Sequence, residues 1–333
     1  MPYMSVLVPV YNSLNTVEQC LKAVRGSSYK DYELIVIDDA SQDGTILVAQ
    51  NYADKLLKIP HHSGRLFARR LGMESAAGEV IVNIDSDILI KPDTLQRIAD
   101  HLLANPHTAA VTGMLSKECP HKNFFSQYKN LYMHYIFRRL PDRVNFLYGS
   151  IYAIRRAGVA HINSLAKIAD DTELGQEIAS KGGRIDFLPA VEVTHLKKYN
   201  LSSFIKNDFI IPFEWAGLFC KYKGWAQLRS CRRFAHSSNR QILSILSACL
   251  LMALTGISFL GMPVFIAQAI LSILWAVLNI RFMEFLLAER GIGFAALSIF
   301  ITFIDNLVMF CGVLIGFLMN ASGRGGSLKI YLI

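Results

Sequence analysis

The 333-residue sequence lacks the features of several protein classes, and each absence narrows the possibilities. No two of its six cysteines form a Cys-x-x-Cys pair, the spacing typical of zinc sites. We therefore expect no structural zinc, and free thiols in a reducing compartment. No segment repeats along the chain. Met1-Pro-Tyr-Met4 leads directly into an apolar run without the features of a secretory signal peptide, so we expect the N-terminal part in the cytosol.

Charge is also scarce, because only 18% of the residues are charged whereas 52% are hydrophobic. With a mean hydropathy of +0.32, the chain is too apolar for a single soluble domain of this size. The excess lies in three C-terminal stretches with at most one charge, at about 242–260, 263–280 and 292–319. At ~1.5 Å per residue, helices of this length span the hydrocarbon core of a bilayer. We predict three transmembrane helices within residues 241–320; the alternative is a set of buried helices in a soluble protein.

Basic residues surround these stretches. The segment 197–240 mixes Lys and Arg with aromatic residues, which predicts interfacial helices on the membrane, or alternatively amphipathic core helices. A polar loop expected at 281–291 adds Arg281 and Arg290. Both basic segments should lie inside the cell, with a flexible tail at 321–333 outside. The net charge of +8 then indicates anionic membrane lipids as partners and not nucleic acid.

Two carboxylates follow an apolar run in the N-terminal part. Val80 to Ile84 leads into Asp85-Ser86-Asp87, the pattern by which a buried strand delivers ligands to its carboxyl end. Carboxylates one residue apart on an extended chain can hold Mg²⁺ or Mn²⁺, which completes its shell with substrate phosphate oxygens. A nucleotide diphosphate is therefore the first ligand to consider, although a strand followed by a polar turn produces the same pattern.

Two earlier apolar runs end in polar loops in the same way. Ser5 to Val10 and Tyr32 to Ile37 are each followed by a polar turn and a helical pattern, and the second ends in Asp38-Asp39. Repeated strand, loop and helix units predict a parallel α/β sheet over residues 1–196 whose strand ends share one crevice.

These elements together resemble family-2 glycosyltransferases of the GT-A fold. The resemblance is carried by Ser5-Val-Leu-Val-Pro-Val-Tyr-Asn12, by Ile35-Val-Ile-Asp-Asp-Ala-Ser-Gln-Asp-Gly-Thr45, by Gly64-Arg-Leu-Phe-Ala-Arg-Arg-Leu-Gly72 and by Gly78 to Asp87. In the third element Arg70 replaces the usual Asn. The four elements occur in the family's order. The implied fold class is an α/β, Rossmann-like GT-A domain followed by an α-helical membrane region.

The resemblance implies roles for individual residues. Asp39 would hold the nucleotide base, Asp85 would face the donor, and Asp87 would ligate the metal. Arg69 would contact the donor side, a role suited to a permanently charged guanidinium near phosphates. The remaining residues expected on the donor side are Pro9, Tyr11 and Asp38.

The acceptor hydroxyl also needs a base, because an inverting transfer is a single in-line displacement. Asp170-Asp171-Thr-Glu-Leu174 is similar to the family's Glu-Asp-x-x-Leu element and puts Asp171 at the catalytic position. The same acids could instead cap a helix. Asp170 joins Gly149 and Ser150 as a candidate on the sugar or acceptor side, although Gly149 could also mark a β-bulge. His195 ends the strand predicted from Phe187 and is a candidate second metal ligand.

The sequence thus predicts a membrane-anchored, metal-dependent, inverting glycosyltransferase of the hexosyltransferase type. It would move a sugar from a nucleotide-diphospho-sugar to a lipid-linked or membrane glycan acceptor, with its catalytic domain on the cytosolic side of the bacterial inner membrane. One alternative is a polyprenyl-phosphate glycosyltransferase, although a phosphate acceptor needs no base such as Asp171. A second alternative is a catalytically silent membrane scaffold that only binds nucleotide.

Overall fold

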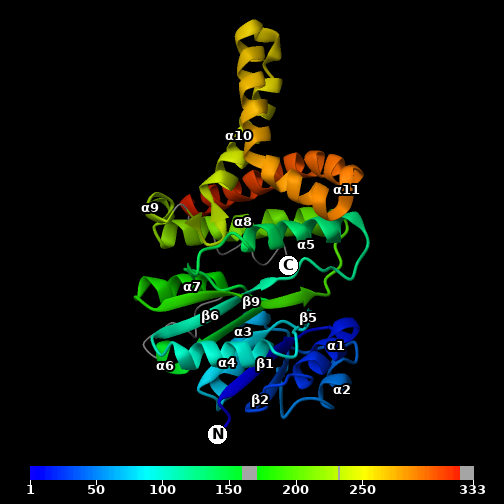
Figure 1. The fold of residues 1–333 in the computed structure, drawn as a ribbon, viewed down its shortest axis with the longest axis vertical. Helices are drawn as coiled ribbons and strands as arrows, with labels where there is room; N and C mark the ends of the chain where they lie inside the picture. Colours follow the sequence, from blue (N-terminus) through cyan, green and yellow to red (C-terminus); the bar gives the residue numbers. More distant parts are fainter. Residues whose placement is uncertain (160–170, 232, 323–333) are drawn as a thin grey trace. The chain divides into compact units, whose positions relative to one another are not determined.

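The computed structural model describes residues 1–159, 171–231 and 233–322, which form two compact units. The first unit comprises residues 1–122 and 136–198, and the second comprises residues 123–135 and 199–333. Figure 1 follows the chain through the elements of both units. The helix segment 123–135, which we predicted within the first domain, belongs to the second unit. It does so because its aromatic side chains, including Tyr128, pack in one cluster with Phe204 and Phe282.

The first unit is built around one mixed sheet. Its strands are β1 (Met4–Val10), β2 (Tyr32–Asp38), β3 (Lys55–Lys58), β4 (Val80–Ile84), β5 (Ile88–Leu89), β6 (Thr108–Leu115), β7 (Arg143–Val144), β8 (Ile151–Arg155) and β9 (Arg184–His195). Its helices are α1 (Leu14–Arg25), α2 (Thr45–Ala49), α3 (Arg65–Ser75), α4 (Thr94–Ala104), α6 (Arg156–Val159) and α7 (Asp171–Ser180). The strand order is β3-β2-β1-β4-β8-β6-β9-β5, and β7 also pairs with β9.

The prediction of a parallel sheet is wrong at β8, and also at β5 and β7, which are antiparallel to β9. The strands β3, β2, β1 and β4 are parallel neighbours, and β6 is parallel to β9, but β8 is antiparallel to both β4 and β6. The register pairs Ile151, the first residue of β8, with Ile84, the last residue of β4. β8 therefore begins at the carboxyl edge of the sheet. An antiparallel strand of this kind needs no crossover connection. As a result, the residues just before β8 lie beside the ends of the parallel strands.

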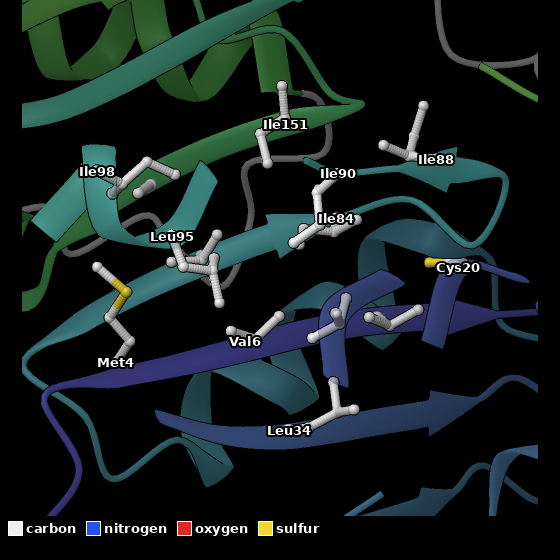
Figure 2. Packing of buried hydrophobic residues seen from close by; sticks show 14 of the residues in the cluster. Met4, Val6, Cys20, Leu34, Ile84, Ile88, Ile90, Leu95, Ile98 and Ile151 are labelled. Carbon is white, nitrogen blue, oxygen red and sulfur yellow. The ribbon is translucent and has the colours of Figure 1, made fainter. Parts of the chain in front are cut away.

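Alternating side chains of the strands fill both faces of this sheet. Met4 and Val6 of β1 belong to one cluster with residues of α1 and α4, whereas Leu7 belongs to a second cluster with residues of α3 and α7. Figure 2 shows the first cluster, in which Leu95 and Ile98 of α4 lie over the sheet. Helices on both faces bury the strands, which explains their near-continuous apolar runs. The polar carboxyl ends remain as the place for a ligand.

The second unit is helical. Its elements are α5 (Phe124–Phe137, of which 124–135 belong here), α8 (Leu201–Lys221), α9 (Gly224–Ser230), β10 (Arg233–Phe234), β11 (Ser237–Ser238), α10 (Asn239–Thr255), the short 3₁₀ helix η1 (Ser258–Leu260) and α11 (Met262–Ala321). Helix α8 packs closely on α11, because a Cβ atom at Gly312 or Gly316 would lie 2.4 or 2.5 Å from the carbonyl oxygen of Phe209 or Phe213. Glycines four residues apart thus allow two helix backbones to approach.

The polar loop predicted at 281–291 is wrong, because α11 continues through it and departs from helical geometry only at Gly291 (φ 78°). The stretch before Gly291 contains good helix formers such as Glu284 and Arg290 and no Pro or Gly, so its polarity does not end the helix. Among the described helices, α11 is the one long and apolar enough to cross a membrane, and α10 is a shorter apolar helix. The three transmembrane spans stay a prediction.

One charged group lies deep in this helical unit. Asp305 of α11 is 1% exposed, and neither of its carboxylate oxygens has a hydrogen-bond partner among the described residues. It faces Asp208 of α8, whose carboxylate forms an ion pair with Lys129 of α5. The ion pair of Lys129 with Asp208 thus links α5 to α8, and Asp305 of α11 lies beside it.

Candidate functional site

The predicted carboxylates gather at the carboxyl edge of the sheet in the first unit. Asp85 follows β4, and its backbone N–H donates to the carbonyl oxygen of Ser150 at 3.3 Å, which ties the end of β4 to the start of β8. The side chains of Asp85 and Asp87 are 27% and 29% exposed. Both can therefore reach a ligand while their backbone is held by the sheet.

The structure brings together His195 and Asp87, the two predicted metal ligands. β5 pairs with the end of β9, Ile88 opposite His195, and the backbone N–H of Leu196 donates to the carbonyl oxygen of Asp87 at 2.7 Å. This register leaves His195 Nε2 3.4 Å from Asp87 Oδ2. Burial lowers the pKa of the His195 imidazole, and the nearby Asp87 carboxylate only partly opposes this effect. A neutral imidazole is the form that binds metal.

This pair fits a divalent cation that shares its shell with a substrate. The described residues contain no group of three or more His, Cys, Asp or Glu side chains that could hold a metal ion. Mg²⁺ and related cations are commonly held by one or two protein ligands plus phosphate oxygens. Asp87 and His195 supply one oxygen and one nitrogen donor. Two protein ligands are thus too few for a structural metal site. They are sufficient for a cation whose remaining ligands come from the substrate.

Arg69 of α3 lies at the centre of the site. It is 4% exposed, and its guanidinium joins three groups: Asp85 Oδ1 at 2.7 Å, the carbonyl oxygen of Gly149 at 3.1 Å and Asp171 Oδ1 at 3.3 Å. The attraction of Asp85 and Asp171 raises the pKa of Arg69 well above its ordinary value, although desolvation opposes it. The planar guanidinium can bridge two carboxylates at once. Arg69 is therefore a buried bridge between them.

Asp171 is the first residue of α7, and its side chain is 14% exposed. Its carboxylate fills the space beside Gly149, where a Cβ atom would lie 2.7 Å from Asp171 Oδ2 and 2.8 Å from its Cγ. Gly149 thus makes room for the Asp171 carboxylate. Asp170, the other acid of this motif, lies outside the described residues.

The N-terminal candidates divide into two groups. Asp39 and Tyr11 lie in loops at the strand ends, and Asp39 accepts hydrogen bonds from the backbone N–H groups of Ser63 (2.7 Å) and Gly64 (2.8 Å). Pro9 and Asp38, like Asp39, are buried and are not brought to an open surface. Pro9 is buried within β1 opposite Ile37, and the buried Asp38 carboxylate accepts a local bond from the Ser41 N–H at 3.3 Å. Pro9 is therefore part of a strand interior, and the Asp38 carboxylate stabilises a tight turn.

The structure adds two residues that the sequence analysis did not single out. Asn83 of β4 is fully buried and donates from Nδ2 to the carbonyl oxygen of Gly149 at 2.9 Å. An Asn within an otherwise apolar strand was the available signal, because buried polar groups need a partner. The Nδ1 atom of His62 lies 2.8 Å from Oδ2 of Asp39. Its position depends on the fold of a loop, for which a lone histidine in the sequence is no guide.

The chain is similar to known glycosyltransferases in sequence and in fold. Residues 5–162 match the model of a family described as glycosyl transferase family 2. The chain is 36% identical over 110 residues to an uncharacterized glycosyltransferase of Haemophilus influenzae, covering 32% of this chain and 44% of that protein. It is 34% identical over 121 residues to the putative glycosyltransferase EpsE of Bacillus subtilis, covering 34% and 44%. The chain thus spans less than half the length of these relatives.

A solved structure extends the comparison to the fold. A mannosyltransferase of Pyrobaculum calidifontis, PcManGT, determined in complex with GDP-Man and Mn²⁺, superposes with a TM-score of 0.55 at 19% identity. The match covers 98% of this chain and 88% of that one. The predicted fold class, an α/β domain of GT-A type followed by a helical region, is confirmed. Residues 5–162 are therefore similar to glycosyl transferase family 2, and the chain has a fold of the GT-A type.

Proposed function

We propose that this protein is an inverting glycosyltransferase that moves a sugar from a nucleotide-diphospho-sugar to an acceptor hydroxyl. The observation that carries the proposal is the Arg69 bridge, which holds Asp85 and Asp171 at one sheet edge where Asp87 and His195 also meet. A donor-side carboxylate, a metal-binding pair and a candidate base are the groups that a single displacement at the anomeric carbon requires.

Asp87 and His195 would hold a divalent cation, Mg²⁺ or Mn²⁺, at the donor diphosphate. When bound, the cation would neutralise charge on the departing diphosphate. The neutral imidazole of His195 and the half-buried carboxylate of Asp87 suit that role. The complex of PcManGT with GDP-Man and Mn²⁺ supports the same class of donor and cation here.

Asp171 would accept the proton of the acceptor hydroxyl. Its Oδ1 lies 3.3 Å from Arg69 Nη1, so the guanidinium holds the carboxylate in place at the sheet edge. This arrangement favours a hydroxyl acceptor over a polyprenyl phosphate, because a phosphate brings no proton to remove. Asp85 would face the donor sugar, with its carboxylate held in place by the same arginine.

The acceptor would be a lipid-linked or membrane glycan, reached by a catalytic domain on the cytosolic side of a bacterial inner membrane. The length and apolar character of α11 support an anchor in the bilayer. The basic and aromatic residues between 197 and 240 support contact with anionic lipid.

The test is transfer and donor hydrolysis by the full-length protein in detergent, measured against a panel of nucleotide sugars with Mn²⁺, Mg²⁺ or EDTA. Asp87→Asn should abolish the metal stimulation, because the cation loses its anionic ligand. Asp171→Asn should keep donor affinity but lower turnover by ~10² or more, as expected for a lost general base. A wild-type protein that binds nucleotide but neither hydrolyses nor transfers any donor would identify a silent nucleotide-binding scaffold instead.

A further inference from the structure

A histidine next to Asp39 has no role in the mechanism described above. The ring of His62 stacks on the ring of Tyr11, with 3.8 Å between centroids and 19° between planes. The side chain of His62 is 45% exposed, and Tyr11 is 44% exposed. These two residues come from different loops at the carboxyl edge of the sheet, one after β1 and one between β3 and α3. Together they form a solvent-accessible aromatic pair.

The carboxylate of Asp39 is already engaged by its own loop. It accepts from the backbone N–H groups of Ser63 at 2.7 Å and Gly64 at 2.8 Å, and its Oδ2 lies 2.8 Å from His62 Nδ1. The residue is 1% exposed. A buried carboxylate with three partners has little capacity left for a ligand. It can, however, fix the orientation of the histidine ring, because a carboxylate on one ring nitrogen directs the other nitrogen away from it.

We propose that His62, oriented by Asp39, binds the base of a nucleoside diphosphate. The base would stack against the His62–Tyr11 pair, and Nε2 of His62 would hydrogen-bond to the base edge. Asp39 would then act through His62 rather than on the base itself, which differs from the role that the family resemblance gives to Asp39. This inference rests on the proposed function, because it places the base of the same donor.

The chain offers a matched control for this proposal. His61 precedes His62 and is also exposed, yet its side chain has no hydrogen bond, ion pair or ring contact among the described residues. His61→Ala therefore removes an adjacent imidazole of the same kind without touching the Tyr11 stack. His62→Phe keeps a ring against Tyr11 but removes both ring nitrogens.

The experiment measures binding of UDP, GDP, CDP, ADP and inorganic pyrophosphate to the full-length protein in detergent with Mn²⁺. His62→Ala should weaken binding of the preferred nucleoside diphosphate by about 10-fold or more, the scale of one lost base stack. Binding of pyrophosphate should not change. His61→Ala should match the wild type. His62→Phe should recover most of the affinity but lose the preference among bases.

Equal binding of nucleoside diphosphates by wild-type and His62→Ala protein would overturn this inference alone. An equal loss for pyrophosphate would also overturn it, since that result would reflect a collapsed loop. The same weak binding in His62→Phe as in His62→Ala would contradict the stacking contact. A wild-type protein that binds pyrophosphate but no nucleoside diphosphate would overturn the proposed function together with this inference.

Discussion

A methyl group added at Gly149 tests the placement of the candidate base directly. The new Cβ of Gly149→Ala would lie 2.7 Å from Asp171 Oδ2, 2.8 Å from its Cγ and 2.9 Å from its Oδ1. Atoms cannot remain that close, so the carboxylate must move. Gly149 does not have a positive φ, so alanine introduces no backbone strain there. The substitution therefore acts on the Asp171 carboxylate through its size.

The size of the effect follows from the distances. Ordinary contact begins about 0.5–1 Å beyond these values, so the carboxylate shifts by roughly that amount, and a misplacement of about 1 Å can cost ~10² in rate. We expect turnover to fall between about 10- and 100-fold. Donor affinity should hold, because Asp87 and His195 lie outside the contact. Overpacking of this kind costs about 1–3 kcal/mol of stability, which leaves the domain folded.

The assay is transfer turnover and nucleoside diphosphate affinity for Gly149→Ala, Asp171→Asn and the double variant. If Gly149→Ala acts through Asp171, it causes no further loss in the Asp171→Asn background. Gly293→Ala is the control, because a Cβ there meets nothing within 4 Å. Wild-type turnover in Gly149→Ala, or an unchanged fold-loss in the Asp171→Asn background, would refute the reasoning.

Three further predictions concern charged groups. Arg69→Lys keeps the charge but cannot bridge two carboxylates as a guanidinium does, so we expect turnover to fall at least about 10-fold in steady-state kinetics. Burial alone would raise the pKa of Asp186, but hydrogen bonds, first among them that of Arg184, lower it below its ordinary value near 3.8. The stabilisation is thus present above about pH 4 and lost as the pH falls through the folded pKa. Asp186→Asn should therefore lower the free energy of unfolding by about 2 kcal/mol at pH 7. In urea unfolding, the variant should also lose stability less steeply at acid pH than the wild type. Asp305→Leu should leave metal-dependent donor hydrolysis within about twofold of the wild type in membrane preparations, because its neighbours all belong to the helical unit.

The gathering of Asp85, Asp87 and His195 at one sheet edge could be predicted because each lies at or just after the end of a strand. Asp85 and Asp87 come directly after β4, and His195 is the last residue of β9. Parallel strands present their carboxyl ends at one edge, so the sequence pattern alone brings residues more than 100 positions apart into one site. The same logic placed the helical stripe of α1, whose Val17, Cys20, Leu21 and Val24 are all buried.

The parts that escaped prediction depend on loops and on packing between elements. The contact between Gly149 and Asp171 requires the antiparallel entry of β8, which no periodicity signals. The pairing of His62 with Asp39 depends on the turn that ends in Gly64, whose φ is +86°. In the helical unit, we predicted a polar loop at residues 281–291 because four charged residues interrupt the apolar sequence there. Helix propensity, and the absence of a breaker before Gly291, decided the structure instead.

The charges at this edge bear on how the proposed diphosphate donor would bind. Asp85, Asp87 and Asp171 supply three carboxylates, and the buried Arg69 supplies one positive charge, while burial favours a neutral His195. Arg69 is also committed to Asp85, Asp171 and the Gly149 carbonyl, so it cannot turn to a phosphate without releasing the base. A diphosphate entering beside this excess of negative charge is repelled unless further positive charge comes with it. In the proposed mechanism, a divalent cation held by Asp87 and His195 would offset that repulsion, and Arg69 would remain available to position Asp171.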